Sequence, residues 1–308
     1  MKNVILVFPG QGSQYVGMGK DLYENFSYVR EFFEKASDII KVDFRKLCFE
    51  GPEEELKETY NTQPSIFLIS ASMFEVIRRE SSDKFNFVCA AGHSLGEYSA
   101  LYSAGVFSFE DGIRIVRKRG ELMSKADPEG KGGMAAVIGL DSAKIKEICD
   151  SFSSQGKYVE PVNYNSPDQT VISGYKDVIS EISEKLKETG AKRIIELSVS
   201  GAFHSKLMER PAKEFKEFLI SFNFNAPKFP VLANYNSEPY PSDKEEIIDM
   251  MSKQMHSPVL WTKIVDKFGS YNFEMVIEVG PGQVLKGLIK KTNPNIEVQT
   301  FSIDIIKV

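Results

Sequence analysis

The residue in this sequence most suited to chemistry is Ser94, at the centre of Gly92-His93-Ser94-Leu95-Gly96. A serine flanked by glycines two residues away, between an apolar run and a helical stretch, is typical of a nucleophile elbow. Glycine is favoured there because the strained turn leaves no room for side chains. Unpaired N–H groups at the following helix start can stabilise an oxyanion. The pattern predicts a nucleophilic serine; the alternative is a glycine-rich turn in which Ser94 is only a helix N-cap.

A nucleophilic serine needs a base, and histidine is the usual one. The chain has three histidines. His93 adjoins Ser94, and neighbouring side chains at a strand end diverge, whereas His256 follows a predicted helix and could equally be a surface residue. His204, in a loop of small residues before a helix, is therefore the expected base. No acidic residue stands out where a hydrolase triad would have one, so we expect a dyad whose imidazole is held by a backbone carbonyl.

Arg119 is the candidate for substrate selection. It lies in a helix predicted over residues 109–125, which also presents Arg117 and Lys118. An arginine that points inward could bind a carboxylate through two hydrogen bonds and would stay charged when buried. The alternative is a solvated basic face. An inward arginine would select an acyl group that ends in a carboxylate.

The elements that must position these residues begin with a β-prone run, residues 4–8, typical of a strand buried on both faces of a parallel sheet. The glycine-rich loop after it, residues 10–14, would lie at the same sheet edge as the elbow and could lend a backbone N–H to an oxyanion hole. Neither this loop nor Gly280-Pro281-Gly282 completes a nucleotide-binding motif. A further helix is expected from about Pro64 to Arg79.

The middle of the chain has a different order of elements. After a linker at residues 127–133, the pattern predicts strand, helix, two strands, helix and strand, which is typical of a ferredoxin-like domain. We therefore expect an α/β fold with two parts. The large, hydrolase-like domain with a parallel sheet comprises residues 1–127 and 199–308, and the inserted ferredoxin-like (βαββαβ) domain comprises residues 128–198.

Composition narrows the function classes. The chain has 308 residues, 42% hydrophobic and 26% charged, with a net charge of -5, which argues against a general nucleic-acid binder. Cys48, Cys89 and Cys149 lack the spacing of a disulfide framework or a zinc site. No stretch approaches the ~20 apolar residues that span a bilayer. We expect a cytoplasmic monomer without a metal, a nucleic-acid partner or a membrane partner.

Taken together, these residues resemble the malonyl-CoA:acyl carrier protein transacylases, the family of fatty-acid and polyketide acyltransferases. The matching stretches follow the family order over nearly the whole chain. They are Phe8-Pro9-Gly10-Gln11-Gly12-Ser13-Gln14, Thr62-Gln63-Pro64, Gly92-His93-Ser94-Leu95-Gly96-Glu97-Tyr98, Arg119-Gly120, Gly133-Met134-Ala135-Ala136-Val137, Asn163-Tyr164-Asn165-Ser166-Pro167, Phe203-His204-Ser205, Gln254 with Pro258 and Trp261-Thr262, and Gly280-Pro281-Gly282.

The resemblance implies roles for single residues. Ser94 would be acylated and His204 would be its base, with the main-chain carbonyl of Gln254 holding the imidazole. Arg119 would bind the free carboxylate of a malonyl group, with Gln63 nearby. The backbone N–H groups of Gln11 and Leu95 would form the oxyanion hole, and Leu95 with Ala202-Phe203 resembles malonyl-selecting relatives.

The resemblance also implies a reaction and its partners. Malonyl-CoA would load Ser94, and the phosphopantetheine thiol of acyl carrier protein would then take the malonyl group for fatty-acid elongation. No cofactor would be bound permanently, and lysines near the cleft would steer the acidic carrier. A discrete acyltransferase of a polyketide pathway, a serine thioesterase or hydrolase, and a non-catalytic docking module for acyl carriers remain as alternatives.

One stretch departs from the family pattern. Relatives often have Asn-Val-x-Ala where this chain has Asn234-Tyr235-Asn236-Ser237. We expect the difference to affect local loop packing and to touch no proposed catalytic group.

Overall fold

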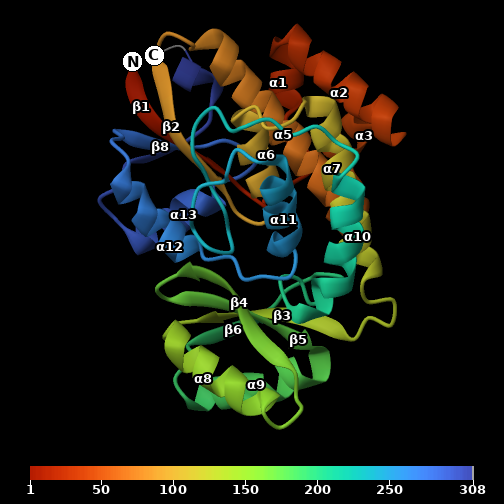
Figure 1. The fold of residues 1–308 in the computed structure, drawn as a ribbon, viewed down its shortest axis with the longest axis vertical. Coiled ribbons are helices and arrows are strands. Elements are labelled where there is room, and N and C mark those ends of the chain that lie inside the picture. Colours follow the sequence, from red (N-terminus) through yellow and green to blue (C-terminus); the bar gives the residue numbers. More distant parts are fainter. Residues whose placement is uncertain (307–308) are drawn as a thin grey trace.

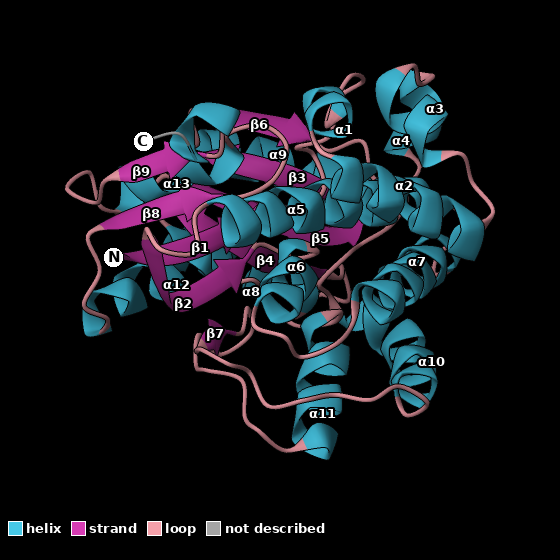
Figure 2. Ribbon diagram, turned by 90° about the horizontal axis from the view of Figure 1, so that it is seen from above, coloured by secondary structure: helices cyan, strands magenta, loops and turns pink. Residues whose placement is uncertain are grey.

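The computed structural model describes residues 1–306 and contains two β-sheets, one above the other in Figure 1. The larger sheet has five parallel strands in the order β7-β2-β1-β8-β9. Figure 2 shows these strands side by side between layers of helices. The strands are β1 (Lys2–Phe8), β2 (Phe85–Gly92), β7 (Val231–Leu232), β8 (Met275–Glu278) and β9 (Val298–Thr300).

Side chains of β1 alternate between two apolar cores, which is why the whole run is hydrophobic. Val4, Leu6 and Phe8 pack in the larger core, and Ile5 and Val7 pack in the second. Helices α5 (Thr59–Glu80), α6 (Gly96–Ser103) and α7 (Phe109–Lys125) contribute to the first core, and α12 (Trp261–Lys267) and α13 (Val284–Thr292) contribute to the second.

The remaining helices surround this centre. The helices within residues 20–57 cover α5 and α7 on one side. Helix α10 packs beside α11 near the smaller sheet (Figure 1). These helices are α1 (Lys20–Asn25), α2 (Ser27–Ile40), α3 (Phe44–Phe49), α4 (Glu53–Lys57), α10 (Glu209–Leu219) and α11 (Lys244–Gln254), with short 3-10 turns η1 (Lys206–Met208), η2 (Phe268–Ser270) and η3 (Ile303–Ile306).

The smaller sheet is antiparallel, in the order β4-β5-β3-β6. It is built from β3 (Gly132–Ile138), α8 (Ser142–Ser153), β4 (Val159–Ser166), β5 (Gln169–Tyr175), α9 (Lys176–Glu188) and β6 (Arg193–Glu196). Helices α8 and α9 share a separate apolar core with one face of these strands. The predicted fold class, a parallel sheet with an inserted ferredoxin-like unit, is confirmed.

Backbone pairing joins β4 of the smaller sheet to the segment just before α12. Tyr164 N–H donates to the Val259 carbonyl at 2.9 Å, and Val259 N–H donates to the Val162 carbonyl at 2.7 Å. The chain enters the smaller sheet near residue 132 and leaves it near residue 196. There, a Cβ added to Gly132 would lie 2.8 Å from the Ala202 nitrogen. The two crossing segments therefore lie side by side, which supports the division into residues 1–127 with 199–308 and residues 128–198; that division stays a prediction.

Candidate active site

Ser94 lies in a sharp turn between β2 and α6. Its φ of 51° is in the left-handed region, which is unfavourable for residues other than glycine. A Cβ on Gly92 would lie 1.9 Å from the carbonyl carbon of Gly96, and a Cβ on Gly96 would lie 1.9 Å from the Phe8 carbonyl oxygen. Positions 92 and 96 must therefore be glycine, because the two ends of the turn pack against each other and against β1. The turn has the geometry of a nucleophile elbow.

His204 faces the hydroxyl of Ser94. The distance from its Nε2 to Ser94 Oγ is 2.7 Å. On the other side of the ring, Nδ1 lies 3.0 Å from the Gln254 carbonyl oxygen and 3.2 Å from that of Ser257. Because carbonyl oxygens only accept hydrogen bonds, the proton belongs on Nδ1 and the lone pair of Nε2 faces the serine.

The surroundings of His204 keep the imidazole neutral. The side chain is buried, and burial, followed by the positive charge of Arg119, lowers the pKa of His204 to about 3. A neutral ring with its lone pair toward a hydroxyl can accept the hydroxyl proton.

Neither of the other two histidines makes a hydrogen bond to Ser94 Oγ within residues 1–306. His93 borders the same cavity, but its Nε2 lies 2.7 Å from Asn165 Oδ1 and its ring centroid 5.7 Å from that of Trp261. His256 is not among the residues that line the cavity beside Ser94. Within residues 1–306, His204 is therefore the histidine placed to act on Ser94.

Arg119 points inward from α7 and is 1% exposed. Nη1 donates to Gln63 Oε1 at 2.8 Å, and Nη2 donates to Gln254 Oε1 at 2.9 Å and to Ser94 Oγ at 3.3 Å. The guanidinium also lies 5.2 Å from the ring centroid of Tyr98. Burial lowers the pKa of Arg119, but arginine remains protonated in proteins.

No carboxylate pairs with Arg119 among the described residues. Its acceptors are neutral amide oxygens, so the positive charge remains available to an anion in the cavity. Arg117 and Lys118, the neighbouring cations on α7, have partners outside the cavity. Arg117 forms an ion pair with Glu121 at 2.7 Å, and Lys118 lies over the ring of Phe218.

The loop after β1 packs against the elbow. Phe8 pairs with Gly92 in the sheet register, and a Cβ on Gly10 would lie 2.4 Å from the His93 carbonyl oxygen. The backbone N–H groups of Gln11 and Leu95 donate to no acceptor within residues 1–306. Both residues line the cavity beside Ser94, as expected for donors to an oxyanion.

The cavity itself is small, at about 90 Å³. Apolar side chains from the elbow, the smaller sheet and the segment after β6 close it: Leu95, Met134, Leu197, Val199 and Phe203. Its polar walls come from Gln11, Gln63, His93, Ser94, Arg119, Asn163 and His204. The structure thus brings together every predicted site residue, with Gln254 entering through its contacts to His204, Arg119 and Ser94. Ala202 is not part of this lining.

Two residues of the site were not predicted. Asn234 Oδ1 accepts a hydrogen bond from Ser94 N–H at 2.7 Å, and the backbone N–H of Asn234 donates to Glu97 Oε2 at 2.6 Å. Asn234 is the position that this stretch shares with the family pattern. The departing residues Tyr235 and Ser237 make no hydrogen bond to a proposed catalytic group among residues 1–306, so the expectation that the difference touches no such group is not contradicted. Burial raises the pKa of Glu97 to about 7, and hydrogen bonds from Tyr240 and Asn234 limit the rise.

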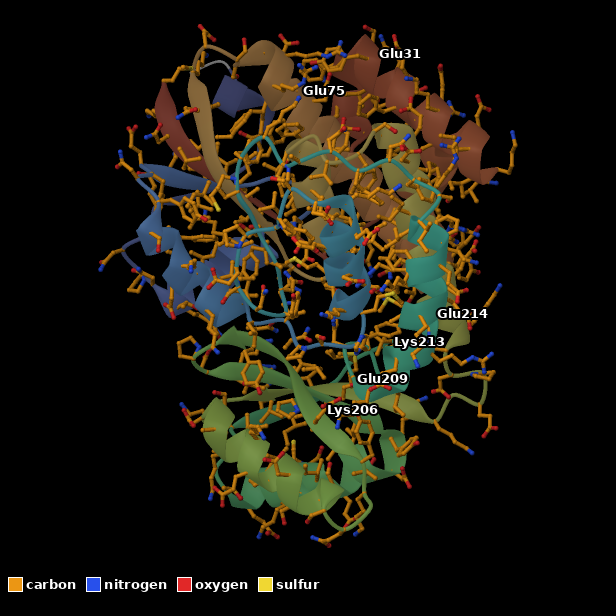
Figure 3. The ribbon with its side chains drawn as sticks, in the orientation of Figure 1. Glu31, Glu75, Lys206, Glu209, Lys213 and Glu214 are labelled. Carbon is orange, nitrogen blue, oxygen red and sulfur yellow. The ribbon has the colours of Figure 1, made fainter. Side chains whose placement is uncertain are left out.

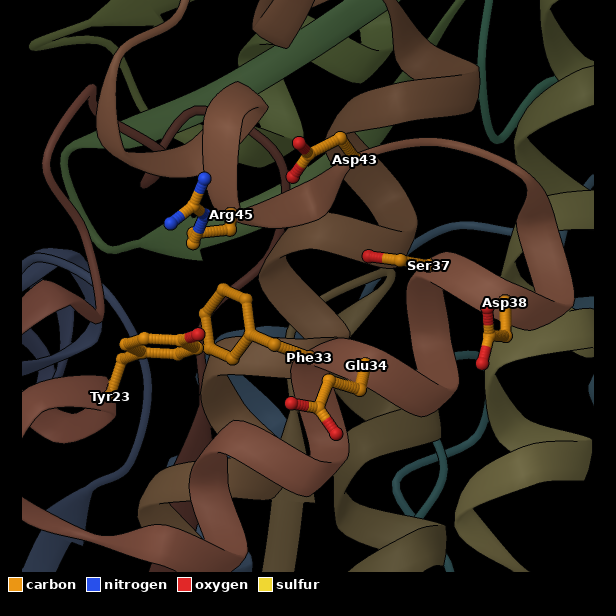
Figure 4. A pocket seen from close by; sticks show the side chains of 7 residues that line it. All are labelled: Tyr23, Phe33, Glu34, Ser37, Asp38, Asp43 and Arg45. Carbon is orange, nitrogen blue, oxygen red and sulfur yellow. The ribbon is translucent and has the colours of Figure 1, made fainter.

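Other surface features lack this chemistry. A cavity of about 380 Å³ beside α2 (Figure 4) is acidic, and its serine, Ser37, accepts from the Phe44 backbone at 3.2 Å. Its lining is Tyr23, Phe33, Glu34, Ser37, Asp38, Asp43 and Arg45. Within the described part of the chain, no cluster of potential metal ligands occurs, and no helix is long and apolar enough to cross a membrane.

The charged surface around α10 is mixed. Lys206 and Lys213 are exposed there, but Glu209 and Glu214 lie among them (Figure 3). This helix therefore does not present a uniformly basic surface, and the expected steering of an acidic carrier by cleft lysines stays a prediction.

A serine that faces a neutral imidazole at the end of a parallel strand defines a serine-dependent acyl-transfer site. The chain belongs to the acyl transferase domain family, whose model matches residues 5–302. It is 43% identical over 301 residues to the malonyl CoA-acyl carrier protein transacylase of Staphylococcus aureus strain MRSA252, covering 98% of this chain and 96% of that protein. The Bacillus subtilis protein of the same name is 41% identical over 302 residues, covering 98% and 94%.

Solved structures agree. The malonyl CoA-acyl carrier protein transacylase from Coxiella burnetii superposes with a TM-score of 0.95 at 34% identity, covering 100% of this chain and 96% of that one. A malonyl-transacylase in complex with a type II PKS acyl-carrier protein superposes with a TM-score of 0.93 at 38% identity, covering 98% and 96%.

Proposed function

We propose that this protein transfers the malonyl group of malonyl-CoA to the phosphopantetheine thiol of acyl carrier protein, through a malonyl ester on Ser94, and so supplies fatty-acid elongation. The observation that carries the proposal is the buried guanidinium of Arg119, which has no carboxylate partner in the described chain and donates to Ser94 Oγ at 3.3 Å. The names of the relatives agree with this donor and acceptor.

Acylation begins with His204. Its Nε2 accepts the proton of Ser94 Oγ while the oxygen attacks the thioester carbon. The carbonyl oxygen becomes negative, and the unpaired N–H groups of Gln11 and Leu95 stabilise it. The tetrahedral intermediate then collapses, the C–S bond breaks, and the imidazolium of His204 returns its proton to the thiolate of coenzyme A.

Transfer to the carrier repeats these steps in reverse order. The phosphopantetheine thiol gives its proton to His204 Nε2 and attacks the malonyl ester. The C–O bond to Ser94 breaks, and the serine oxygen recovers the proton. All these groups come from one chain, so the mechanism needs neither a resident cofactor nor a second copy of the protein.

Arg119 selects the acyl group that is transferred. In malonyl-CoA the free carboxylate lies two bonds from the thioester carbon, and a guanidinium beside the nucleophile can bind it through parallel hydrogen bonds. Gln63 and Gln254 hold the guanidinium in place with neutral oxygens, at 2.8 and 2.9 Å, so they orient the charge without neutralising it. An acyl group without a carboxylate would leave this charge buried and unpaired.

The proposal is tested by intact-mass analysis after a brief incubation with malonyl-CoA. We expect one malonyl adduct, mapped to Ser94 by peptide analysis and missing in Ser94→Ala. Acetyl-CoA serves as the matched donor without a carboxylate and should give far less adduct. An adduct on another residue, or equal loading by both donors, would contradict the proposal.

A further inference from the structure

Asn234 makes two hydrogen bonds to the backbone on the N-terminal side of Ser94. Its side-chain Oδ1 accepts from Ser94 N–H at 2.7 Å, and its Nδ2 donates to the Gly92 carbonyl oxygen at 2.6 Å. The residue is fully buried. A single amide side chain thus fixes the backbone immediately before and at the serine.

Glu97 holds Asn234 in turn. It lies in the first turn of α6, three residues after Ser94, and is fully buried. Its Oε2 accepts from the Asn234 backbone N–H at 2.6 Å, and its Oε1 accepts from the Tyr240 hydroxyl. The elbow, Asn234 and Glu97 therefore form a closed ring of hydrogen bonds that begins and ends on the same strand-turn-helix unit.

The ring has two consequences for the reacting atoms. A left-handed serine persists only where its surroundings hold it. Asn234 fixes the backbone on the N-terminal side of Ser94, and its Oδ1 also lies 3.4 Å from the Nε2 of Gln254, which holds the carbonyl on the C-terminal side. Asn234 also occupies Ser94 N–H, which leaves Leu95 N–H as the elbow donor for an oxyanion. The side chain of Gln254 donates to the Ser94 carbonyl at 2.6 Å, and in a trans peptide this turns Leu95 N–H in the opposite direction.

We propose that Asn234 and Glu97 are positioning residues that hold Ser94 in its left-handed conformation and, by occupying Ser94 N–H, leave Leu95 N–H as the elbow donor for the developing oxyanion. The inference rests on the proposed role of Ser94 as nucleophile. It assigns the hydrogen bonds of Glu97 as the functional feature, because both carboxylate oxygens accept from neutral donors. The positive charge of Arg119 also acts on this carboxylate, so a variant that removes the negative charge and keeps the hydrogen bonds is the deciding one.

The test compares Asn234→Ala with the wild-type protein by rapid-quench mass analysis of Ser94 acylation. We expect the acylation rate constant to fall roughly 100-fold, as misplacement of a reacting group by about 1 Å can do. The apparent affinity for malonyl-CoA should change by less than about 3-fold, because Arg119 and its two glutamines remain in place. A purely structural role would lower the folded fraction and leave the rate per folded molecule unchanged, and that result would overturn the proposal.

Variants of Glu97 separate hydrogen bonding from charge. Glu97→Gln keeps an acceptor for Asn234 and can donate to the Tyr240 oxygen, so we expect acylation within about 3-fold of wild type, whereas Glu97→Ala should resemble Asn234→Ala. Glu75→Ala is the matched control, since Glu75 is a buried carboxylate on α5, paired with Arg78 and Arg79, and does not line the cavity beside Ser94. Figure 3 shows Glu75 at the end of the molecule away from the smaller sheet. It should lose stability but not acylation rate. A Glu97→Gln variant as slow as Glu97→Ala would contradict the assignment.

A second readout makes the inference independent of the cargo. A fluorophosphonate probe labels an activated serine without needing a malonyl group, and labelling should also slow in Asn234→Ala. If the wild-type protein takes the probe but no malonyl group, the proposed function fails while the inference is still tested. Should Asn234→Ala not fold, Asn234→Asp keeps the acceptor for Ser94 but loses the donor to Gly92. We then expect labelling about tenfold slower, and a wild-type rate would refute the positioning role.

Discussion

At the scale of single residues, the charge of Arg119 separates this cavity from a site for neutral esters. A buried cation whose hydrogen bonds go to neutral amide and hydroxyl oxygens is unfavourable until an anion binds, so a substrate carboxylate gains more here than in water. The same guanidinium reaches the nucleophile, so binding of the carboxylate and orientation of the thioester depend on one side chain.

Replacement of that side chain should change selectivity more than overall reactivity. We expect Arg119→Ala to lose malonyl transfer by at least about 100-fold, because a buried hydrogen-bonded charge pair is worth roughly 3 kcal/mol or more. Acetyl transfer should fall far less. The measurement is kcat/KM for both donors. Arg119→Lys is the comparison variant, because lysine keeps the positive charge but cannot bind a carboxylate through two parallel hydrogen bonds. Equal losses for the two donors would refute the carboxylate clamp.

The depressed pKa of His204 predicts an unusual pH profile. The base must be neutral, and its pKa of about 3 lies well below the ordinary histidine value, so acylation should remain nearly constant from about pH 8 down to about pH 5. Arg119 is the second cause of the depression after burial, so Arg119→Ala should move the acid limb to higher pH. The profile of kcat/KM checks both statements. An acid limb at the ordinary histidine pKa in the wild-type protein would show that His204 is not the buried base.

Residue types alone could predict Ser94, His204 and Arg119, because few side chains supply a nucleophile, a base and a fork for a carboxylate. Sequence could not predict Asn234, since its contribution depends on where β7 ends relative to the elbow, 140 residues away along the chain. Nor could it predict that Ser257 would supply a second carbonyl to His204. Such contacts are set by packing and leave no local pattern.

At the scale of elements, the elbow depends on how closely β1, β2 and α6 approach one another. The glycines at 92 and 96 are required by this contact and not by backbone conformation, because neither has a positive φ. The turn can expose Ser94 only while both positions lack a side chain.

Two helical glycines offer a matched test. Gly96→Ala places a Cβ 1.9 Å from the Phe8 carbonyl oxygen, so we expect it to destabilise the fold by more than about 3 kcal/mol and to abolish acylation. Gly287→Ala in α13 meets nothing within 4 Å and should stabilise the protein by about 0.5–1 kcal/mol. Denaturant unfolding of both variants checks these values. A fully stable, active Gly96→Ala protein would contradict the packing described for the elbow.

The elements themselves were largely predictable where their apolar pattern is strong. The helix Phe109–Lys125 has the predicted bounds, and the strand–helix order of the smaller sheet follows from alternation and turn residues. The helix expected from Pro64 instead begins at Thr59 and contains the proline. Proline favours a helix start, but burial of this helix against α7 extended it beyond that local signal. Strand β7 has only two residues and gives almost no periodic pattern.

At the scale of the whole molecule, the cavity lies between the elbow and the smaller sheet. The turn after β2 supplies Ser94 and Leu95 and α7 supplies Arg119, while Met134 and Asn163 come from β3 and β4 of the smaller sheet. This cavity of about 90 Å³ has room for a short acyl chain. We expect a malonyl ester formed there to wait for a thiol instead of hydrolysing.

The fate of that ester tests the central claim most directly. Malonyl-loaded protein, freed of malonyl-CoA, is mixed with acyl carrier protein bearing phosphopantetheine or with buffer alone, and the Ser94 adduct is followed by intact mass. We predict that the adduct disappears much faster with the carrier and that the malonyl group is recovered on the carrier thiol. Loss of the adduct at the same rate in both samples, with free malonate as the product, would contradict the account and indicate a thioesterase.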